Sequence, residues 1–451
     1  MAAGAEVVAI TFFMSVSVIK SCKAKLGISF DTGSFVFPTF VPRMRTFNEH
    51  TLPNGLRIVH EASPTGVVYC GYVVMAGTRH EDAPDSGMAH FCEHLTFKGT
   101  RRRRACHIAN GLERVGGDLN AYTSKQETVY YATVLRGDFA RAVDLLSDIV
   151  FHSVYPQREI DREVDVIADE IDSYNDSPAE LIYDEFESMV FAGHPLGRDI
   201  LGDAARLRQY TTADARRFTG RYYRPSHVGF YCYGQVDFAR VVRTVERATA
   251  GLEPGFEPAS PQPLPEYRPE VRRVPRGTHQ THVLVGGRAF GGSDDRHVGL
   301  VLLNNLMAGP GMNARLNTVL RERAGLVYTV EGSLLTYPDA GAWCVYFGCD
   351  EADVARCCRL VSREYARLVE SPLSPARLAA AKKQLKGQIG IGCDSFENYA
   401  LALGKTYAHY GRPRDVERLF ARIDSLTVSD LQAIAQAAFP PERMTTLIYT
   451  R

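Results

Sequence analysis

The residues best suited to chemistry in this chain are two histidines and a glutamate close together in the sequence. His90, Glu93 and His94 form a His-x-x-Glu-His array. With 3.6 residues per helical turn, the two histidines lie about one turn apart on nearly the same face, with Glu93 beside them. Neutral imidazoles are good zinc ligands, and a catalytic zinc usually takes three protein ligands and a water. The array therefore predicts a metal site for hydrolysis, in which Glu93 is free to act on the water.

The flanking sequence predicts that the array lies on one short helix. Pro84, Asp85 and Ser86 supply a start with an N-cap, and Lys98-Gly99 supplies a stop. Apolar residues recur with helical spacing at Met88, Phe91, Cys92 and Leu95. The histidines should lie beside this buried stripe. The alternative is that all three polar residues are ordinary packing and surface groups.

A third ligand is expected on residues 156–171, which read as a long helix with Pro156 at its start. Its apolar stripe consists of Ile160, Val164, Ile167 and Ile171. Glu163 and Glu170 lie two turns apart along the edge of that stripe, so both carboxylates could face inward. The pattern alone neither chooses between them nor excludes Asp169.

The order His90-x-x-Glu93-His94 followed by Glu170 resembles the inverted zinc motif of the pitrilysin, insulinase and mitochondrial processing peptidase family, in its small two-domain form. The resemblance implies that His90, His94 and Glu170 bind one Zn²⁺ per chain. It implies that Glu93 is the general base and that Glu163 is a supporting acid. It extends over nearly the whole chain from about residue 45 onward.

Three flanking segments carry the same resemblance. Residues 51–56 resemble the family's opening strand, and residues 116–123 resemble its substrate-binding edge strand. Asn120 and Ala121 would there offer backbone groups to an extended peptide. Arg321 and Tyr328 resemble a C-terminal pair that contacts substrate, from the same chain or from the facing subunit. The ordinary alternatives are a hairpin turn at 118–123, a solvated arginine and a core tyrosine.

An internal repeat predicts the fold. Three landmarks recur in nearly constant register, with Asp138, Tyr210 and Pro225 matched by Asp353, Leu426 and Pro441. Each half reads as strands followed by long helices, so we expect an α+β fold of two homologous halves. Each half should be an antiparallel sheet with helices packed on one face.

The repeat also predicts the domain boundaries and which half binds the metal. We expect an N-terminal extension (1–44), a zinc-binding catalytic domain (45–250), a Pro-rich linker (251–275) and a homologous C-terminal domain (276–451) that carries the Arg/Tyr pair. An offset of about 216 residues places Leu306, Gly309 and Pro310 opposite His90, Glu93 and His94. None of these can replace a metal ligand, so only the first half should hold zinc.

Composition excludes several kinds of partner. The chain has 52 basic and 52 acidic residues, so no global field favours nucleic acid or anionic membranes. Its 10 cysteines show no C-x-x-C spacing and read as reduced thiols, which favours a cytoplasmic protein over an exported or mitochondrial one. The apolar run 7–19 is too short to span a bilayer, and Met44 is an alternative start.

The favoured function is a zinc-dependent metalloendopeptidase that hydrolyses peptides or unfolded segments inside an enclosed chamber. The chamber would form when the chain pairs as a homodimer or as a heterodimer with a paralogous subunit. The alternative is a non-catalytic or structural subunit of a processing-peptidase-like complex. A third reading, a metal-binding module without hydrolysis, leaves Glu93 without a role.

Overall fold

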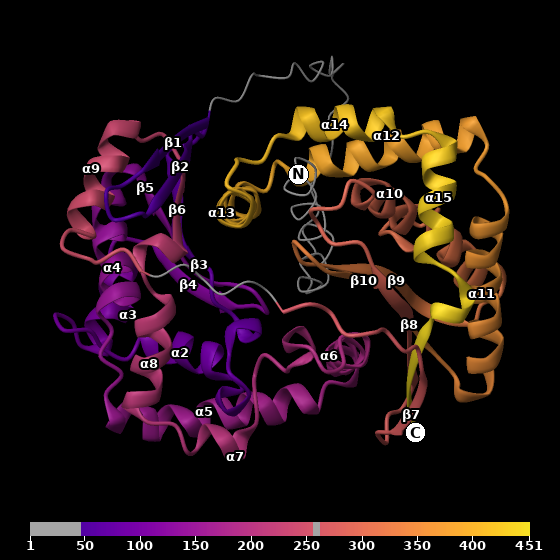
Figure 1. Ribbon diagram of the computed structural model, residues 1–451, viewed down its shortest axis with the longest axis horizontal. Helices are drawn as coiled ribbons and strands as arrows, with labels where there is room; N and C mark the ends of the chain where they lie inside the picture. The colour runs from indigo at the N-terminus through magenta and orange to yellow at the C-terminus, as the bar shows by residue number, and fades with distance from the viewer. Residues whose placement is uncertain (1–46, 256–261) are drawn as a thin grey trace, which may run out of the picture.

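The computed structural model describes residues 47–255 and 262–451, which form two sheets facing each other (Figure 1). The expected extension 1–44, with its apolar run and Met44, lies outside the described residues. The first sheet has the strand order β1-β2-β6-β3-β5-β4, and the second has the order β7-β11-β8-β10-β9. From β2 and β7 onward the two orders correspond strand for strand, so the expected α+β fold of two similar halves is confirmed.

The strands of the first sheet are β1 (Phe47–Thr51), β2 (Arg57–Glu61), β3 (Val67–Val74), β4 (Asp118–Thr123), β5 (Thr128–Leu135) and β6 (Val228–Tyr233). Those of the second are β7 (Val271–Pro275), β8 (Thr281–Ala289), β9 (Val327–Thr336), β10 (Gly341–Cys349) and β11 (Thr445–Thr450). The last five residues of the expected linker 251–275 thus form a strand, β7.

The helices of the first half are α2 (Met88–Thr96), α3 (Ala105–Glu113), α4 (Phe139–His152), α5 (Gln157–Asn175), α6 (Pro178–Val190), α7 (Ala204–Leu207), α8 (Thr212–Tyr222) and α9 (Phe238–Ala248). Those of the second half are α10 (His297–Ala308), the π-helix η7 (Asn317–Arg323), α11 (Val354–Glu370), α12 (Pro375–Gly392), α13 (Phe396–Tyr410), α14 (Val416–Ser425) and α15 (Val428–Ala438).

The repeat landmarks fall at equivalent places in the two halves. Helix α4 begins directly after Asp138 and α11 directly after Asp353. Helix α8 begins two residues after Tyr210, and α15 begins two residues after Leu426. The constant offset fails at α2, because the loop from β8 to α10 is shorter than the loop from β3 to α2. Leu306 therefore lies near the end of α10, with Gly309 and Pro310 beyond it, and these residues are not the structural counterparts of the array.

Each sheet contains one parallel pair, so neither is purely antiparallel as expected. β2 pairs in parallel with β6, and β7 pairs in parallel with β11, whereas the other neighbours are antiparallel. Parallel neighbours need a long crossover connection. The chain provides one in each half, since most of the helices lie between the two strands of each parallel pair.

Helices cover both faces of each sheet, which corrects the expectation of one covered face. On the outer face of the first sheet lie α4 and α9, whereas α13 from the second half contacts β2, β3 and β6. Reciprocally, α6 from the first half contacts β8 and β11 of the second sheet. Figure 1 shows α13 beside the first sheet and α6 beside the second. The two halves therefore exchange one helix each.

Strand alternation explains the exchange. In β3, Val68, Cys70 and Tyr72 belong to the core under the first-half helices. Val73 instead belongs to a core shared with Tyr399 of α13. Successive side chains of a strand point to opposite faces of the sheet. A strand with apolar residues at both odd and even positions therefore needs helices packed on both faces.

Two further expectations concern the chain's surroundings. Among the residues that the structure describes, no helix is long and apolar enough to cross a membrane. The nine cysteines within the described ranges are free thiols, most of them buried. The burial of most of them agrees with their interpretation as packing residues.

Candidate metal centre

The site is assembled from α2 and α5, which pack against each other. His90 and His94 project from α2, and Glu170 projects from α5. The Oε2 atom of Glu170 lies 3.2 Å from Nε2 of His94 and 3.8 Å from Nε2 of His90. One ligand atom from each of the three residues lies within 4.8 Å of the other two, a grouping that occurs once among the described residues.

His94 is held by a second carboxylate on the other side of its ring. Its Nδ1 lies 3.1 Å from Oε1 of Glu163, whose Oε2 is 2.6 Å from Nζ of Lys98. Burial raises the pKa of Glu163, but the bonds from His94 and Lys98 outweigh burial and lower it. An ionised Glu163 accepts a hydrogen bond from Nδ1 of His94, which leaves Nε2, the ring nitrogen beside Glu170, as the atom available to a metal ion.

His90 is the buried member of the group, 7% exposed. Burial, followed by the neighbouring His94, lowers its pKa to about 4, so the imidazole is neutral at pH 7. Its Nδ1 is a buried atom without a hydrogen-bond partner in the structure. A neutral ring is the form that binds a metal ion.

The three side chains fit a zinc ion by the chemistry of their donor atoms. Two imidazole nitrogens and one carboxylate oxygen form the ligand set of many catalytic zinc sites, which keep a fourth position open. In the absence of a metal, burial lowers the pKa of His94, but its bonds to Glu163 and Glu170 raise it to about 9. The two carboxylates beside His94 thus favour positive charge at this position, which a bound cation would supply. Asp169, the alternative left open by the sequence, is exposed and outside the group.

Glu93 lies beside the ligands but is not one of them. Its Oε2 accepts a 2.6 Å hydrogen bond from Oγ1 of Thr123, the last residue of β4. Burial raises the pKa of Glu93, and the bond from Thr123 opposes the shift. Thr123 was not among the site residues expected from the sequence, although it lies in the 116–123 segment. From the sequence, Lys98 was expected only to mark the C-terminal end of the helix.

The start of α2 differs from the expectation. Gly87, with φ of 81°, is the residue before the helix, and Ser86 does not cap it. Glu81 does so instead, because its two carboxylate oxygens accept from the backbone N–H groups of Gly87 at 3.0 Å and Ala89 at 2.8 Å. A Cβ on Gly87 would lie 2.8 Å from Cα of Gly202. Only glycine fits this close approach.

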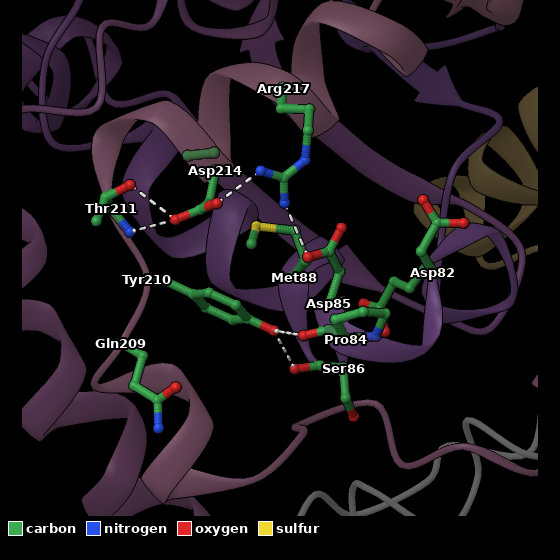
Figure 2. A network of polar contacts seen from close by, with 12 residues as sticks. Asp82, Pro84, Asp85, Ser86, Met88, Gln209, Tyr210, Thr211, Asp214 and Arg217 are labelled. Carbon is green, nitrogen blue, oxygen red and sulfur yellow. Dashed lines mark hydrogen bonds and ion pairs between the residues drawn. The ribbon is translucent and has the colours of Figure 1, made fainter.

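The turn before α2 is fixed by α8 and the residues leading into it (Figure 2). Tyr210 donates its hydroxyl to the carbonyl oxygen of Ser86 at 2.9 Å, with that of Pro84 at 3.4 Å. Arg217 binds Asp85 at 2.8 Å and Asp214 at 2.6 Å. The residues predicted to cap α2 therefore anchor it to α8.

The expected substrate-binding segment is an edge strand. β4 pairs with β5 and has no second neighbour among the described strands. Asn120 is exposed and Ala121 half-buried, and the Ala121 N–H donates to the Asn120 side chain at 3.0 Å. The hairpin alternative is wrong for these residues, since the turn lies beyond them at 124–127.

Arg321 and Tyr328 lie together on the second half. The Arg321 guanidinium is 5.6 Å from the centre of the Tyr328 ring, which is 80% exposed. Both line a cavity of about 340 Å³, together with residues 308–312, 317 and 329–333. The tyrosine is therefore not a core residue. None of the first-half site residues lines this cavity.

Comparison with known proteins agrees with this geometry. The family described as insulinase (peptidase family M16) matches residues 57–204, and the M16 inactive domain matches residues 209–385. This chain belongs to the M16 peptidase family. The matched insulinase region contains all members of the metal centre, whereas the inactive-domain region contains Arg321 and Tyr328.

The relatives of this M16 protein carry related descriptions. An uncharacterized zinc protease of Streptomyces coelicolor is 32% identical over 87% of each chain. One from Mycobacterium leprae is 34% identical over 85% of this chain and 87% of its own. A solved protease from Helicobacter pylori has a TM-score of 0.81 at 21% identity, covering 91% of this chain and 100% of its own. An M16-like peptidase from Alicyclobacillus acidocaldarius has a TM-score of 0.80 at 20% identity, covering 91% and 99%. The last two proteins thus share the fold of this chain.

Proposed function

We propose that this M16 protein is a zinc-dependent metalloendopeptidase that hydrolyses peptides or unfolded segments. One observation carries the proposal: His90, His94 and Glu170 bring three ligand atoms together directly beside the carboxyl group of Glu93. A metal site needs only the first three residues. The added carboxylate, held in place by Thr123, is what a hydrolase requires.

The zinc ion would be held by Nε2 of His90, Nε2 of His94 and Oε2 of Glu170. When bound, it supplies a Lewis acid that polarises the peptide carbonyl and makes water more acidic. Thr123 occupies Oε2 of Glu93, so Oε1 is the atom left to take the proton of the attacking water. Glu93 then returns this proton to the leaving amine. The upward pKa shift from burial suits a carboxylate that must hold a proton briefly near neutral pH.

The edge strand β4 supplies a place for the substrate. An extended peptide can add to its free edge through main-chain hydrogen bonds, which give affinity with little sequence preference. Asn120 and Ala121 lie on this strand, three and two residues before Thr123. Substrate binding would displace the Asn120 side chain from the Ala121 N–H. The strand that binds peptide thus also carries the residue that positions the base.

Arg321 and Tyr328 would contribute a cation and a phenol to the bound peptide. They lie on a cavity of the second half, so they reach the substrate either by approach of the two halves or from a second chain. We propose a dimer of identical or paralogous subunits as the working form. Mixing Glu93→Gln chains with Arg321→Ala chains tests the dimer. Recovered peptidase activity is expected if the pair acts across subunits.

The test of the main proposal is cleavage of a mixed library of unfolded peptides, with and without a metal chelator. We expect chelator-sensitive cleavage by the natural protein. Glu93→Gln should retain zinc but lose about 10²–10⁴-fold in turnover, because only proton transfer is removed. Asp169→Asn removes an exposed carboxylate next to a ligand and should leave both zinc and turnover unchanged. Cleavage that survives the chelator, or full activity of Glu93→Gln, would refute the assignment.

A further inference from the structure

A second concentration of charge lies on the second half, away from the metal centre. A cavity of about 650 Å³ is bounded by the segment around η7, by α11 and by α12. Four arginines line it, namely Arg315, Arg323, Arg367 and Arg377, and Glu364 is the only acidic residue in its wall. We propose that this cavity binds a compact polyanion carrying phosphate or carboxylate groups.

The charges of this cavity are not balanced by the protein. Glu364 is 6% exposed and binds Arg367 at 2.8 Å, so a single carboxylate in the wall faces four guanidinium groups. Across the described ranges 47–255 and 262–451, the guanidinium groups of Arg315, Arg323 and Arg377 form no ion pair with a carboxylate. The wall of the cavity thus carries a net positive charge, with three guanidinium groups outside any ion pair.

The arginines are close enough to repel one another. Burial, followed by the charges of Arg377 and Arg367, lowers the pKa of Arg315, although Glu364 opposes the shift. A half-buried guanidinium near others of the same sign costs free energy that a bound anion would recover.

The walls of the cavity are held in a fixed geometry. Asn313 and Gln384 exchange two hydrogen bonds, at 3.0 and 3.2 Å, that tie the segment before η7 to α12. Both residues line the cavity, together with the hydroxyl-bearing Thr318 and Ser371. Planar guanidinium groups bind phosphate and carboxylate oxygens through paired hydrogen bonds. The volume lies in the range of ordinary small-molecule sites.

The π-helix η7 separates this cavity from the one that holds Arg321 and Tyr328. Arg323 lines the proposed anion cavity, whereas Asn317 and Arg321 line the other. An anion on one side of η7 would therefore restrain the segment that presents Arg321 on the other side. The binding itself does not depend on the proposed peptidase activity.

Titration calorimetry of the zinc-loaded full chain at low ionic strength tests the proposal. Inorganic trimetaphosphate is the phosphate probe, and tricarballylate is the carboxylate probe. Both are compact trivalent anions, and the zinc content is measured after each titration to exclude chelation. We expect at least one probe to bind with a defined stoichiometry of one. Hydrogen exchange of residues 315–323 should slow when that probe is added.

Two matched double variants distinguish binding in this cavity from general attraction of anions to a basic surface. Arg315→Gln combined with Arg377→Gln should raise the Kd more than about tenfold, because two charge-assisted contacts are lost. The control, Arg243→Gln combined with Arg247→Gln, removes the same charge from two exposed positions on α9 and should change the Kd less than about twofold. Binding of one probe alone identifies the anion class. No binding of either probe, or equal weakening in both double variants, would overturn the proposal.

Discussion

His94 is the residue on which the two carboxylates of α5 converge. Glu170 lies on its Nε2 and Glu163 on its Nδ1, so one histidine is both a candidate ligand and the link to a supporting ion pair with Lys98. Outer partners of this kind fix the tautomer and the ring orientation of a ligating histidine. The two acids therefore have different effects although they lie on the same edge of one helix.

Replacement of Glu163 by Gln should weaken zinc binding while leaving the ligands in place. The neutral amide no longer pairs with Lys98 and no longer favours the required tautomer of His94. We expect zinc affinity to fall by about 10–100-fold, measured by competition with a coloured chelator. Asp169→Asn, on the same helix, serves as the control and should retain full affinity. An unchanged affinity of the Glu163 variant would show that the contact has no supporting role.

Thr123→Val should act on turnover and not on metal. The substitution keeps the shape of the side chain but removes the hydroxyl that donates to Glu93. The loss of a hydrogen bond to a charged group amounts to about 1.5–3 kcal/mol, so we expect turnover to fall by about 10–100-fold with zinc content unchanged. A parallel loss of zinc would instead indicate that β4 supports the ligand helix.

Sequence spacing located the residues that act within one helix or along one helix edge. His90, Glu93 and His94 follow directly from the helical period, and Glu170 needed the family resemblance to be chosen over Glu163 and Asp169. Thr123 could not be predicted, because its contact with Glu93 depends on where the edge strand passes α2. Such a contact between distant segments leaves no periodic signal in a single sequence.

Helix α2 is positioned by elements that lie on both sides of it in sequence. Glu81 caps it from the preceding loop, Gly87 allows the sharp entry, and Tyr210 and Arg217 hold the turn against α8. The helix itself was predictable from its apolar stripe. Its N-cap was not predictable. Ser86 and Asp85 are residue types that often cap helices, but here Ser86 accepts from Tyr210 and Asp85 binds Arg217.

Gly87→Ala should disturb the position of α2. Alanine is strained at a φ of 81°, and its Cβ would approach Leu201 O and Gly202 Cα to 2.8 Å. We expect the free energy of unfolding to fall by about 1–3 kcal/mol in urea denaturation, with weaker zinc binding. Gly220→Ala is the control, because that glycine lies within α8 with open space around its Cα. It should stabilise the protein by up to about 1 kcal/mol.

At the scale of the whole molecule, the exchanged helices α6 and α13 join the two halves. A buried ionic cluster reinforces the contact of α13 with the first sheet. Glu127, in the turn between β4 and β5, lies 2.7 Å from Nζ of Lys405 and 2.8 Å from Nε2 of His409. Burial raises the pKa of Glu127, but Lys405 and His409 outweigh it and hold the pKa far below its usual range. The exchange was not predictable from the repeat. The repeat shows only that α6 and α13 take similar positions in the order of elements, and it does not show which sheet each helix contacts.

Glu127→Gln should destabilise the protein at neutral pH by about 3–5 kcal/mol, because it leaves Lys405 buried without a counter-charge. A carboxylate whose pKa is depressed by folding stabilises above its unfolded pKa, about 4.3, and this contribution fades as the pH falls. The difference between the natural protein and the variant should therefore narrow below about pH 4. Urea unfolding from pH 7 to 3 measures it. Glu246→Gln, an exposed change on α9, should show no such trend.

The helix exchange also decides which parts can move relative to each other. The first sheet would travel with α13, and the second sheet with α6, because these contacts are apolar and buried. Opening the molecule to admit a polypeptide would therefore bend the connections on both sides of α6 and α13 as well as the segment between the halves.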